Sequence, residues 1–293
     1  MKNILVPIDF SLKSLNAISL VKRIAKKMNA KVHLVHVIET VKNYPFIKDS
    51  LGESAVDDYL KEMGSLLTRK MRDLSQGLEA EKIETASHLK VGVAFSNIKR
   101  LSKEVDADFI IIGAKGLTNA EEFFLGSLTD KVVRSISVPV FTVKEIGGTS
   151  LKNIVYATDL KKDHEKMLNL LCDLQNTFGS TLHIVKVNTR KNFKNEVSID
   201  KDLLSLAKRF DLKDYTLNSY CHEDEEYGIV YFADKVEADV IALGVNEKSG
   251  IRRLISGGSI SNEVTEHTFR PVLTYHFSKN SGNEEGYRQK RQD

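Results

Sequence analysis

Short apolar runs along the chain alternate with longer stretches in which apolar residues recur at helical spacing. Ile4–Val6 and Phe109–Ile112 are apolar runs typical of buried strands, and Val32–Ile38 is a further predicted strand. In Leu15–Lys27 and Val56–Leu74 the apolar residues recur every three or four positions, which indicates amphipathic helices. Alternation of strand and helix predicts an α/β fold with a parallel sheet covered on both faces.

The rest of the first half continues this alternation. We predict a strand at Thr85–Leu89, a helix at Ala94–Val105, a helix at Ser127–Ser135 and a strand at Val140–Val143. Asp9 and Ser11 stand where the N-cap of the first helix is expected, and Gly77 is expected to end the long helix. In the second half, the acidic run His222–Glu226 predicts a solvated loop before a helix that begins near Ile229.

The second half of the chain repeats the first. KNILVPIDF at 2–10 matches KNIVYATDL at 152–160, and KVHLVHV at 31–37 matches TLHIVKV at 181–187. ADFIIIG at 107–113 then matches ADVIALG at 238–244, and VPVFT at 138–142 matches RPVLT at 270–274. The shared order of blocks indicates a duplication. We therefore expect a first domain at 1–146, a second at 151–278 and a disordered polar tail at 279–293.

Composition excludes several classes of protein. The 293 residues include 43 basic and 40 acidic side chains, and the net charge of +3 is too balanced to favour nucleic-acid binding. No apolar run approaches the roughly 18 residues of a membrane-spanning helix, and the N-terminal strand does not resemble a secretory signal. Cys172 and Cys221 form no CxxC pair. We expect a cytoplasmic protein with no membrane and no nucleic-acid partner.

Two motifs fall at the carboxyl edge of the predicted sheet, where open parallel sheets bind ligands. Pro7–Ile8–Asp9 ends the first strand. GAKG at 113–116 follows the strand at 109–112, and nine residues later Gly126–Ser127 opens a helix. Glycines let backbone amides approach an anion, and a helix N-terminus adds free N–H donors. The spacing therefore predicts a cradle for a phosphate chain.

ADFIIIGAKGLTNAEEFFLGS and the N-terminal ILVPIDFS resemble the universal stress proteins, whose motif is Gly-x2-Gly-x9-Gly-(Ser/Thr). The resemblance covers residues 1–144 well and 151–277 more loosely. It implies two tandem open parallel five-stranded sheets flanked by helices, a Rossmann-like fold of the adenine-nucleotide α-hydrolase type. Family members pair through their last strands, here Val140–Val143 and Val272–Tyr275. The resemblance therefore implies an intrachain pseudo-dimer, and a homodimer stays open as a further association.

The ATP-binding branch of that family implies a set of site residues and a bound ATP, ADP or AMP, with or without Mg²⁺. In that branch the position of Asp9 contacts the adenosine end, and Val37 flanks the adenine through its backbone. Gly126 and the three residues after it hold the ribose and phosphates. The whole expected set is Pro7, Ile8, Asp9, Val37, Ile112, Gly113, Ala114, Gly116, Gly126, Ser127, Leu128 and Thr129.

The second copy departs from this pattern. It keeps Asp159, Gly244 and Gly258–Ser259, but Glu247 stands where the first copy has Gly116. A carboxylate that faces a phosphate costs energy through like-charge repulsion. We interpret the second copy as a degenerate structural partner, with nucleotide binding there as the alternative.

The sequence offers little catalytic chemistry. His33 and His36 are three apart on a strand and point to opposite faces, so we expect two packed histidines, with His36 near the site rim, rather than a shared metal. No Ser–His–Asp or Cys–His pattern and no water-activating residue accompanies the phosphate loop. The residues thus predict a binding protein that is not an enzyme, and the family resemblance implies that it is a nucleotide-responsive stress regulator. The alternatives are a nucleotide-free interaction module and an ATP-hydrolysing or nucleotidyl-transferring enzyme on the same fold.

Overall fold

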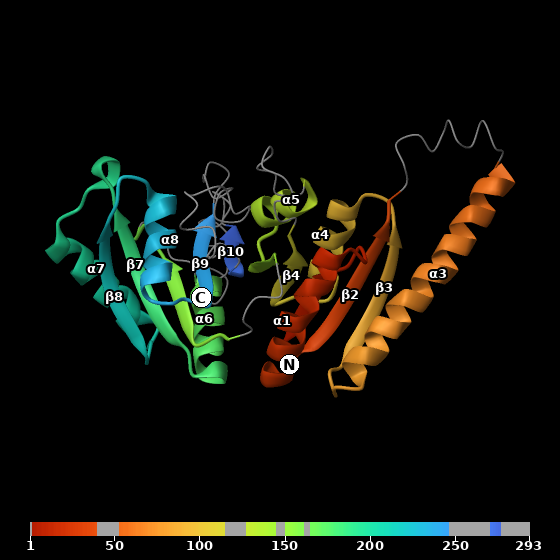
Figure 1. The fold of residues 1–293 in the computed structure, drawn as a ribbon, viewed down its shortest axis with the longest axis horizontal. Coiled ribbons are helices and arrows are strands. Elements are labelled where there is room, and N and C mark those ends of the chain that lie inside the picture. The colour runs from red at the N-terminus through yellow and green to blue at the C-terminus, as the bar shows by residue number, and fades with distance from the viewer. Residues whose placement is uncertain are drawn as a thin grey trace, which may run out of the picture. The chain divides into compact units, whose positions relative to one another are not determined.

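The computed structural model describes residues 2–39, 53–114, 127–144, 150–160, 165–245 and 270–276, without the side chains of 53–60. The chain folds into two compact units, Met1–Gly113 and Ala114–Asp293, in each of which helices flank a sheet (Figure 1). The α/β fold expected from the pattern is confirmed. No helix in these described ranges is long and apolar enough to cross a membrane.

The sheet of the first unit is parallel, in the order β3-β2-β1-β4. Its strands in the described residues are β1 (Asn3–Pro7), β2 (Lys31–Ile38), β3 (Thr85–Val91) and β4 (Phe109–Gly113). Leu5 of β1 pairs in register with Ile110 of β4, and both side chains are fully buried. Burial on both faces explains why these central strands read as continuous apolar runs.

Three helices, α1 (Leu12–Met28), α3 (Glu53–Glu79) and α4 (Ala94–Glu104), pack on this sheet (Figure 1). Ser11 is the N-cap of α1, as expected, and its Oγ accepts a hydrogen bond from Ser14 N at 3.2 Å. The expectation that Gly77 ends the long helix is wrong, because α3 runs through Gly77 to Glu79. Leu78 is fully buried, so packing on the sheet holds the last turn in place despite the glycine.

The second unit also has a layered α/β structure. Its strands lie in the order β5-β10-β9-β6-β7-β8, and neighbouring strands are parallel except for the antiparallel pair β5 and β10. The strands are β5 (Val140–Val143), β6 (Asn153–Ala157), β7 (Thr181–Asn188), β8 (Tyr215–Cys221), β9 (Val240–Val245) and β10 (Val272–His276). The helices are α5 (Ser127–Ser135), α6 (Glu165–Phe178), the 3-10 turn η1 (Arg190–Asn192), α7 (Glu196–Arg209) and α8 (Glu225–Lys235).

The last strands of the two sequence repeats, β5 and β10, pair with each other in this unit. Thr142 Oγ1 donates to Val272 O, and Thr274 Oγ1 donates to Val140 O, both at 3.2 Å. Thr142 and Thr274 occupy the same position in their repeats, so the exchange is reciprocal, as at a two-fold contact. This pairing fits the expected intrachain pseudo-dimer.

Helix α8 begins at Glu225, four residues before the predicted start. Asp224 is its N-cap, and Oδ1 accepts hydrogen bonds from Glu226 N at 2.9 Å and from Tyr227 N at 3.1 Å. The acidic run is therefore a short loop at 222–224 that leads directly into the helix, and the last two residues of the run belong to the first turn and not to a loop. Carboxylates are favourable there because the free N–H groups of a helix start carry partial positive charge.

Candidate functional site

The first unit brings six of the predicted site residues to the carboxyl ends of three adjacent strands, β1, β2 and β4. They are Pro7, Ile8, Asp9, Val37, Ile112 and Gly113. Ile8 N–H continues the sheet beyond β1 by donating to Val35 O at 2.8 Å. Ile8 is buried, whereas Asp9, the next residue, is exposed. The strand end therefore presents the carboxylate of Asp9 to solvent at the edge where such sheets bind ligands.

The Asp9 carboxylate is held in one orientation by the start of α1. Its Oδ1 accepts hydrogen bonds from Ser11 N at 2.9 Å and from Ser11 Oγ at 2.6 Å. Partial burial would raise the pKa of Asp9, but hydrogen bonds from Ser11 and Ser14 outweigh it and hold that pKa below its ordinary value. Both hydrogen bonds from Ser11 fall on Oδ1, so Ser11 does not use Oδ2. Asp9 is thus an ionised acceptor at the sheet edge whose Oδ2 is not bonded to Ser11.

Gly113, the first glycine of the phosphate motif, is also required by packing. A Cβ built at Gly113 would lie 2.6 Å from Lys13 C and 2.7 Å from Ser14 Cα, and closer still to Lys13 O. No side chain fits there, because the first turn of α1 lies directly against the end of β4. Glycine at this position therefore does not by itself indicate a bound phosphate.

Four more predicted site residues belong to the second unit: Ala114, Ser127, Leu128 and Thr129. The N–H of Ala114 donates to Val143 O at 2.7 Å, so β5 uses that amide and it is not free for a ligand. Ser127 is the exposed first residue of α5, and Thr129 is buried. The motif residues Gly116 and Gly126 lie outside the described residues. The cradle as a whole therefore stays a prediction from the sequence.

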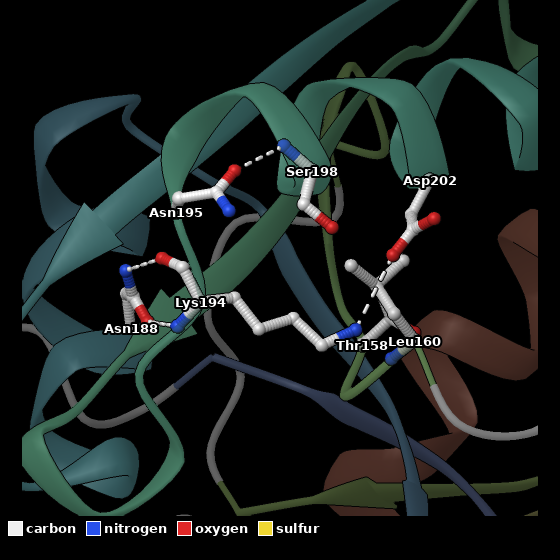
Figure 2. A network of polar contacts seen from close by, with 7 residues as sticks. All are labelled: Thr158, Leu160, Asn188, Lys194, Asn195, Ser198 and Asp202. Carbon is white, nitrogen blue, oxygen red and sulfur yellow. Dashed lines mark hydrogen bonds and ion pairs between the residues drawn. The ribbon is translucent and has the colours of Figure 1, made fainter.

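In the second repeat, polar groups at the ends of β6 and β7 form hydrogen bonds within the loops that follow each strand (Figure 2). Leu160 N donates to Thr158 Oγ1 at 3.1 Å. The side-chain amide of Asn188 donates to Lys194 O at 2.8 Å and accepts from Lys194 N at 3.0 Å. Lys194 Nζ then forms an ion pair with Asp202 at 3.2 Å. These groups are engaged within the protein, which is consistent with a structural role for this repeat.

Both repeats keep one unusual backbone position after their first strand. Phe10 has φ +62° and Leu160 has φ +60°, the left-handed region that costs energy for residues other than glycine. Asp159 precedes Leu160 as Asp9 precedes Phe10. The remaining second-copy motif residues, Glu247, Gly258 and Ser259, lie outside the described residues, whereas Gly244 lies near the end of β9.

The two histidines of β2 have separate partners, as expected. His36 Nδ1 lies 2.6 Å from Ile8 O, at the rim of the site. His33 Nδ1 lies 3.1 Å from His88 Nε2 of β3, a pair that sequence reasoning missed because it depends on strand register. Among the described residues, no group of three or more His, Cys, Asp or Glu side chains is placed to hold a metal ion.

Comparison with known proteins gives matches over both repeats. Universal stress protein MJ0577 of Methanocaldococcus jannaschii is 30% identical over 153 residues, which are 49% of this chain and 94% of that protein. Universal stress protein MJ0531 of the same organism is 28% identical over 146 residues, 49% of this chain and 82% of that protein. A crystal structure of a universal stress protein from Archaeoglobus fulgidus shares the fold, with a TM-score of 0.72 at 20% identity over 94% of this chain and 98% of that chain.

The family profile itself matches twice. The universal stress protein family matches residues 1–144 and again residues 150–276, which together are most of the chain. The chain therefore belongs to the universal stress protein family and carries two copies of its domain in tandem.

Proposed function

We propose that this chain is a cytoplasmic stress regulator that binds one adenine nucleotide, ATP, ADP or AMP, through its first repeat. The observation that carries the proposal is the geometry of Asp9. Its carboxylate is ionised, fixed by Ser11 through Oδ1 and exposed at the carboxyl edge of a parallel sheet, with Oδ2 not bonded to Ser11. A carboxylate at this place in an α/β fold is suited to accept hydrogen bonds from ribose hydroxyls or an adenine amine. Gly126 and residues 127–129 would hold the phosphates, with or without Mg²⁺.

The same geometry favours binding over catalysis. A general base works best when its pKa lies near the working pH. Hydrogen bonds from Ser11 and Ser14 lower the pKa of Asp9 below its ordinary value despite partial burial, so it is a weak base at neutral pH. The nucleotide then acts as a ligand that shifts the protein between conformations or assembly states.

The proposal assigns the nucleotide to the first repeat alone. In the second repeat, Thr158, Asn188 and Lys194 already bond to neighbouring groups at the strand ends. Thr158 and Asn188 are buried, so a ligand that displaced their partners without replacing the hydrogen bonds would cost about 1–3 kcal/mol for each of these two groups.

One observation favours the second candidate, a nucleotide-free interaction module. Gly113 and the amide of Ala114 are both accounted for by packing and by β5 without any ligand. If the other glycines of the motif are also required only for packing, the first repeat would be a structural partner without a nucleotide, like the second repeat.

The test is to denature the purified protein, analyse the released small molecules by chromatography, and titrate ATP with and without Mg²⁺. We expect the wild type to bind ATP and Gly126→Val to bind at least tenfold more weakly. Gly77→Ala, in α3, is the matched control and should bind like the wild type. Absence of released nucleotide together with no binding at millimolar ATP would favour the interaction module. Phosphate release of several turnovers per minute, abolished in Gly126→Val, would instead indicate a hydrolase.

A further inference from the structure

His36 joins the end of β2 to the backbone that carries Asp9. The residue lies one position before Val37 and is half-buried. Its Nδ1 approaches Ile8 O to 2.6 Å, and because a carbonyl can only accept, Nδ1–H is the donor. Ile8 precedes Asp9, so this hydrogen bond fixes the peptide from which the Asp9 side chain projects.

The His36 ring also supports the residue that follows Asp9. The rings of His36 and Phe10 lie 5.1 Å apart at an interplanar angle of 42°. On α3, Lys70 Nζ lies 5.5 Å from the centre of the Phe10 ring, within range of a cation–π contact. The Phe10 ring is therefore contacted by side chains from two elements, β2 and α3.

This support matters because Phe10 is in an unfavourable conformation. Its φ of +62° persists only if the surroundings over-determine it. Phe10 connects Asp9 to Ser11, whose N–H and Oγ both bond to Asp9 Oδ1. If Phe10 relaxed to an extended or helical conformation, Ser11 would leave Asp9 and the carboxylate would lose its fixed orientation.

We infer that His36 is a positioning residue for ligand binding: through Ile8 and Phe10 it holds the Asp9 carboxylate in the orientation that accepts the nucleotide. This inference rests on the proposed nucleotide binding for its ligand, although the contacts themselves lie wholly within the first unit. His36 itself does not touch the nucleotide in this account.

The second repeat provides a natural contrast. Lys186 stands at the position of His36, and Leu160 stands at that of Phe10. Lys186 is 3% exposed and its Nζ donates to Val187 O at 2.9 Å, along its own strand. An aromatic contact like that of His36 with Phe10 is impossible between a lysine and a leucine. Leu160 keeps the left-handed φ without an aromatic contact of this kind, so what is specific to the first repeat is the contact of His36 with Phe10 and with Ile8 O, and not the backbone conformation itself.

The experiment compares His36→Leu, His36→Asn and His36→Gln in the full chain. Asparagine places an N–H donor where Nδ1 of histidine lies, glutamine places it one bond further along, and leucine removes it. ATP is the titrated ligand, and the pKa of Asp9 is measured without ligand by NMR on selectively labelled protein. His33→Asn, on the same strand but bonded to His88, is the matched control.

We expect His36→Leu to weaken ATP binding about five- to tenfold, the usual effect of losing one hydrogen bond. The pKa of Asp9 should rise toward its ordinary value in that variant, because Ser11 no longer holds the carboxylate. His36→Asn should restore both quantities, His36→Gln should not, and His33→Asn should change neither.

Two readouts separate the inference from the proposed function. If the wild type binds no ATP but the pKa of Asp9 follows the expected order, nucleotide binding is refuted and the positioning of Asp9 stands. The inference is overturned if His36→Leu leaves both quantities unchanged, or if His36→Asn is as impaired as His36→Leu. If His36→Leu fails to fold, the His36→Gln protein is measured in its place. Wild-type ATP affinity together with a wild-type pKa of Asp9 in His36→Gln would then overturn the inference.

Discussion

Replacement of Gly113 by alanine should destabilise the protein through packing alone. The added Cβ would lie 2.6 Å from Lys13 C, whereas ordinary contact begins near 3.4 Å. The first turn of α1 would have to move by at least about 0.8 Å, because Lys13 O lies closer still. The obstructing atoms are backbone, so they cannot rotate away as a side chain can. Overpacking a core costs about 1–3 kcal/mol, and we place Gly113→Ala at the upper end, about 3 kcal/mol.

Gly77→Ala is the control, with an effect of opposite sign. Gly77 lies within α3, and nothing lies within 4 Å of a Cβ built there. Alanine in a helix interior is more favourable than glycine by about 0.5–1 kcal/mol, so this variant should be more stable than the wild type.

The assay is equilibrium unfolding in urea, followed by far-ultraviolet circular dichroism, on the two variants and the wild type. The predicted free energies of unfolding of Gly113→Ala and Gly77→Ala differ by about 3.5 kcal/mol. A Gly113→Ala protein within about 0.5 kcal/mol of the wild type would refute the packing role, because α1 would then tolerate a side chain at the end of β4. Equal losses in both variants would also refute it.

Two further predictions concern pH and the pairing of the repeats. Burial is the largest cause that lowers the pKa of His33 and His88 below 6.5, and nearby positive groups lower it further. As the pH falls, these histidines therefore take up protons in the unfolded chain before they do so in the folded protein. The stability that they contribute is present above pH 6.5 and is lost as the pH falls below it. Asn218 is the counterpart of His88, because His88 pairs with Val35 and Asn218 pairs with the matching Val185. His88→Asn should therefore reduce the loss of stability between about pH 7.5 and 5.5, and an unchanged pH dependence would contradict this. Thr142→Val and Thr274→Val should each lower the free energy of unfolding by about 1 kcal/mol, measured in urea, and values that differ by more than about 1 kcal/mol would contradict reciprocal roles.

Much of the fold could be predicted from local pattern because the strands are buried on both faces. Phe109–Ile112 reads as a continuous apolar run for this reason, and β4 covers Phe109–Gly113. Ser11 could be identified as a cap because its chemistry is local, and its Oγ does accept from Ser14 N. The pairing of β5 with β10 also fits the family resemblance.

Other features depend on contacts that local pattern does not carry. The end of α3 is set by burial of Leu78 against the sheet, which overrides the weak helix propensity of Gly77. The pair of His33 and His88 depends on the register of β2 with β3. No residue type signalled the positive φ of Phe10, since aromatic residues rarely adopt it.

The candidate site could be predicted in part. Asp9 lies at the strand end, as the motif indicates, but its orientation depends on Ser11 and on His36, which comes from another strand. The glycine spacing did not reveal that Gly113 is needed for helix packing, because a glycine chosen for close approach to a phosphate and one chosen for close approach to a helix look alike in sequence.

Calorimetric titration of ATP into nucleotide-free protein gives the number of adenine nucleotides bound per chain at saturation, and this number decides whether the first repeat alone binds nucleotide. Asp9 is ionised in the first repeat, whereas the polar groups at the strand ends of the second repeat are already hydrogen-bonded within the protein. We therefore predict that one nucleotide binds per chain and that Gly126→Val abolishes this binding. Two nucleotides per chain, or none, would contradict the account.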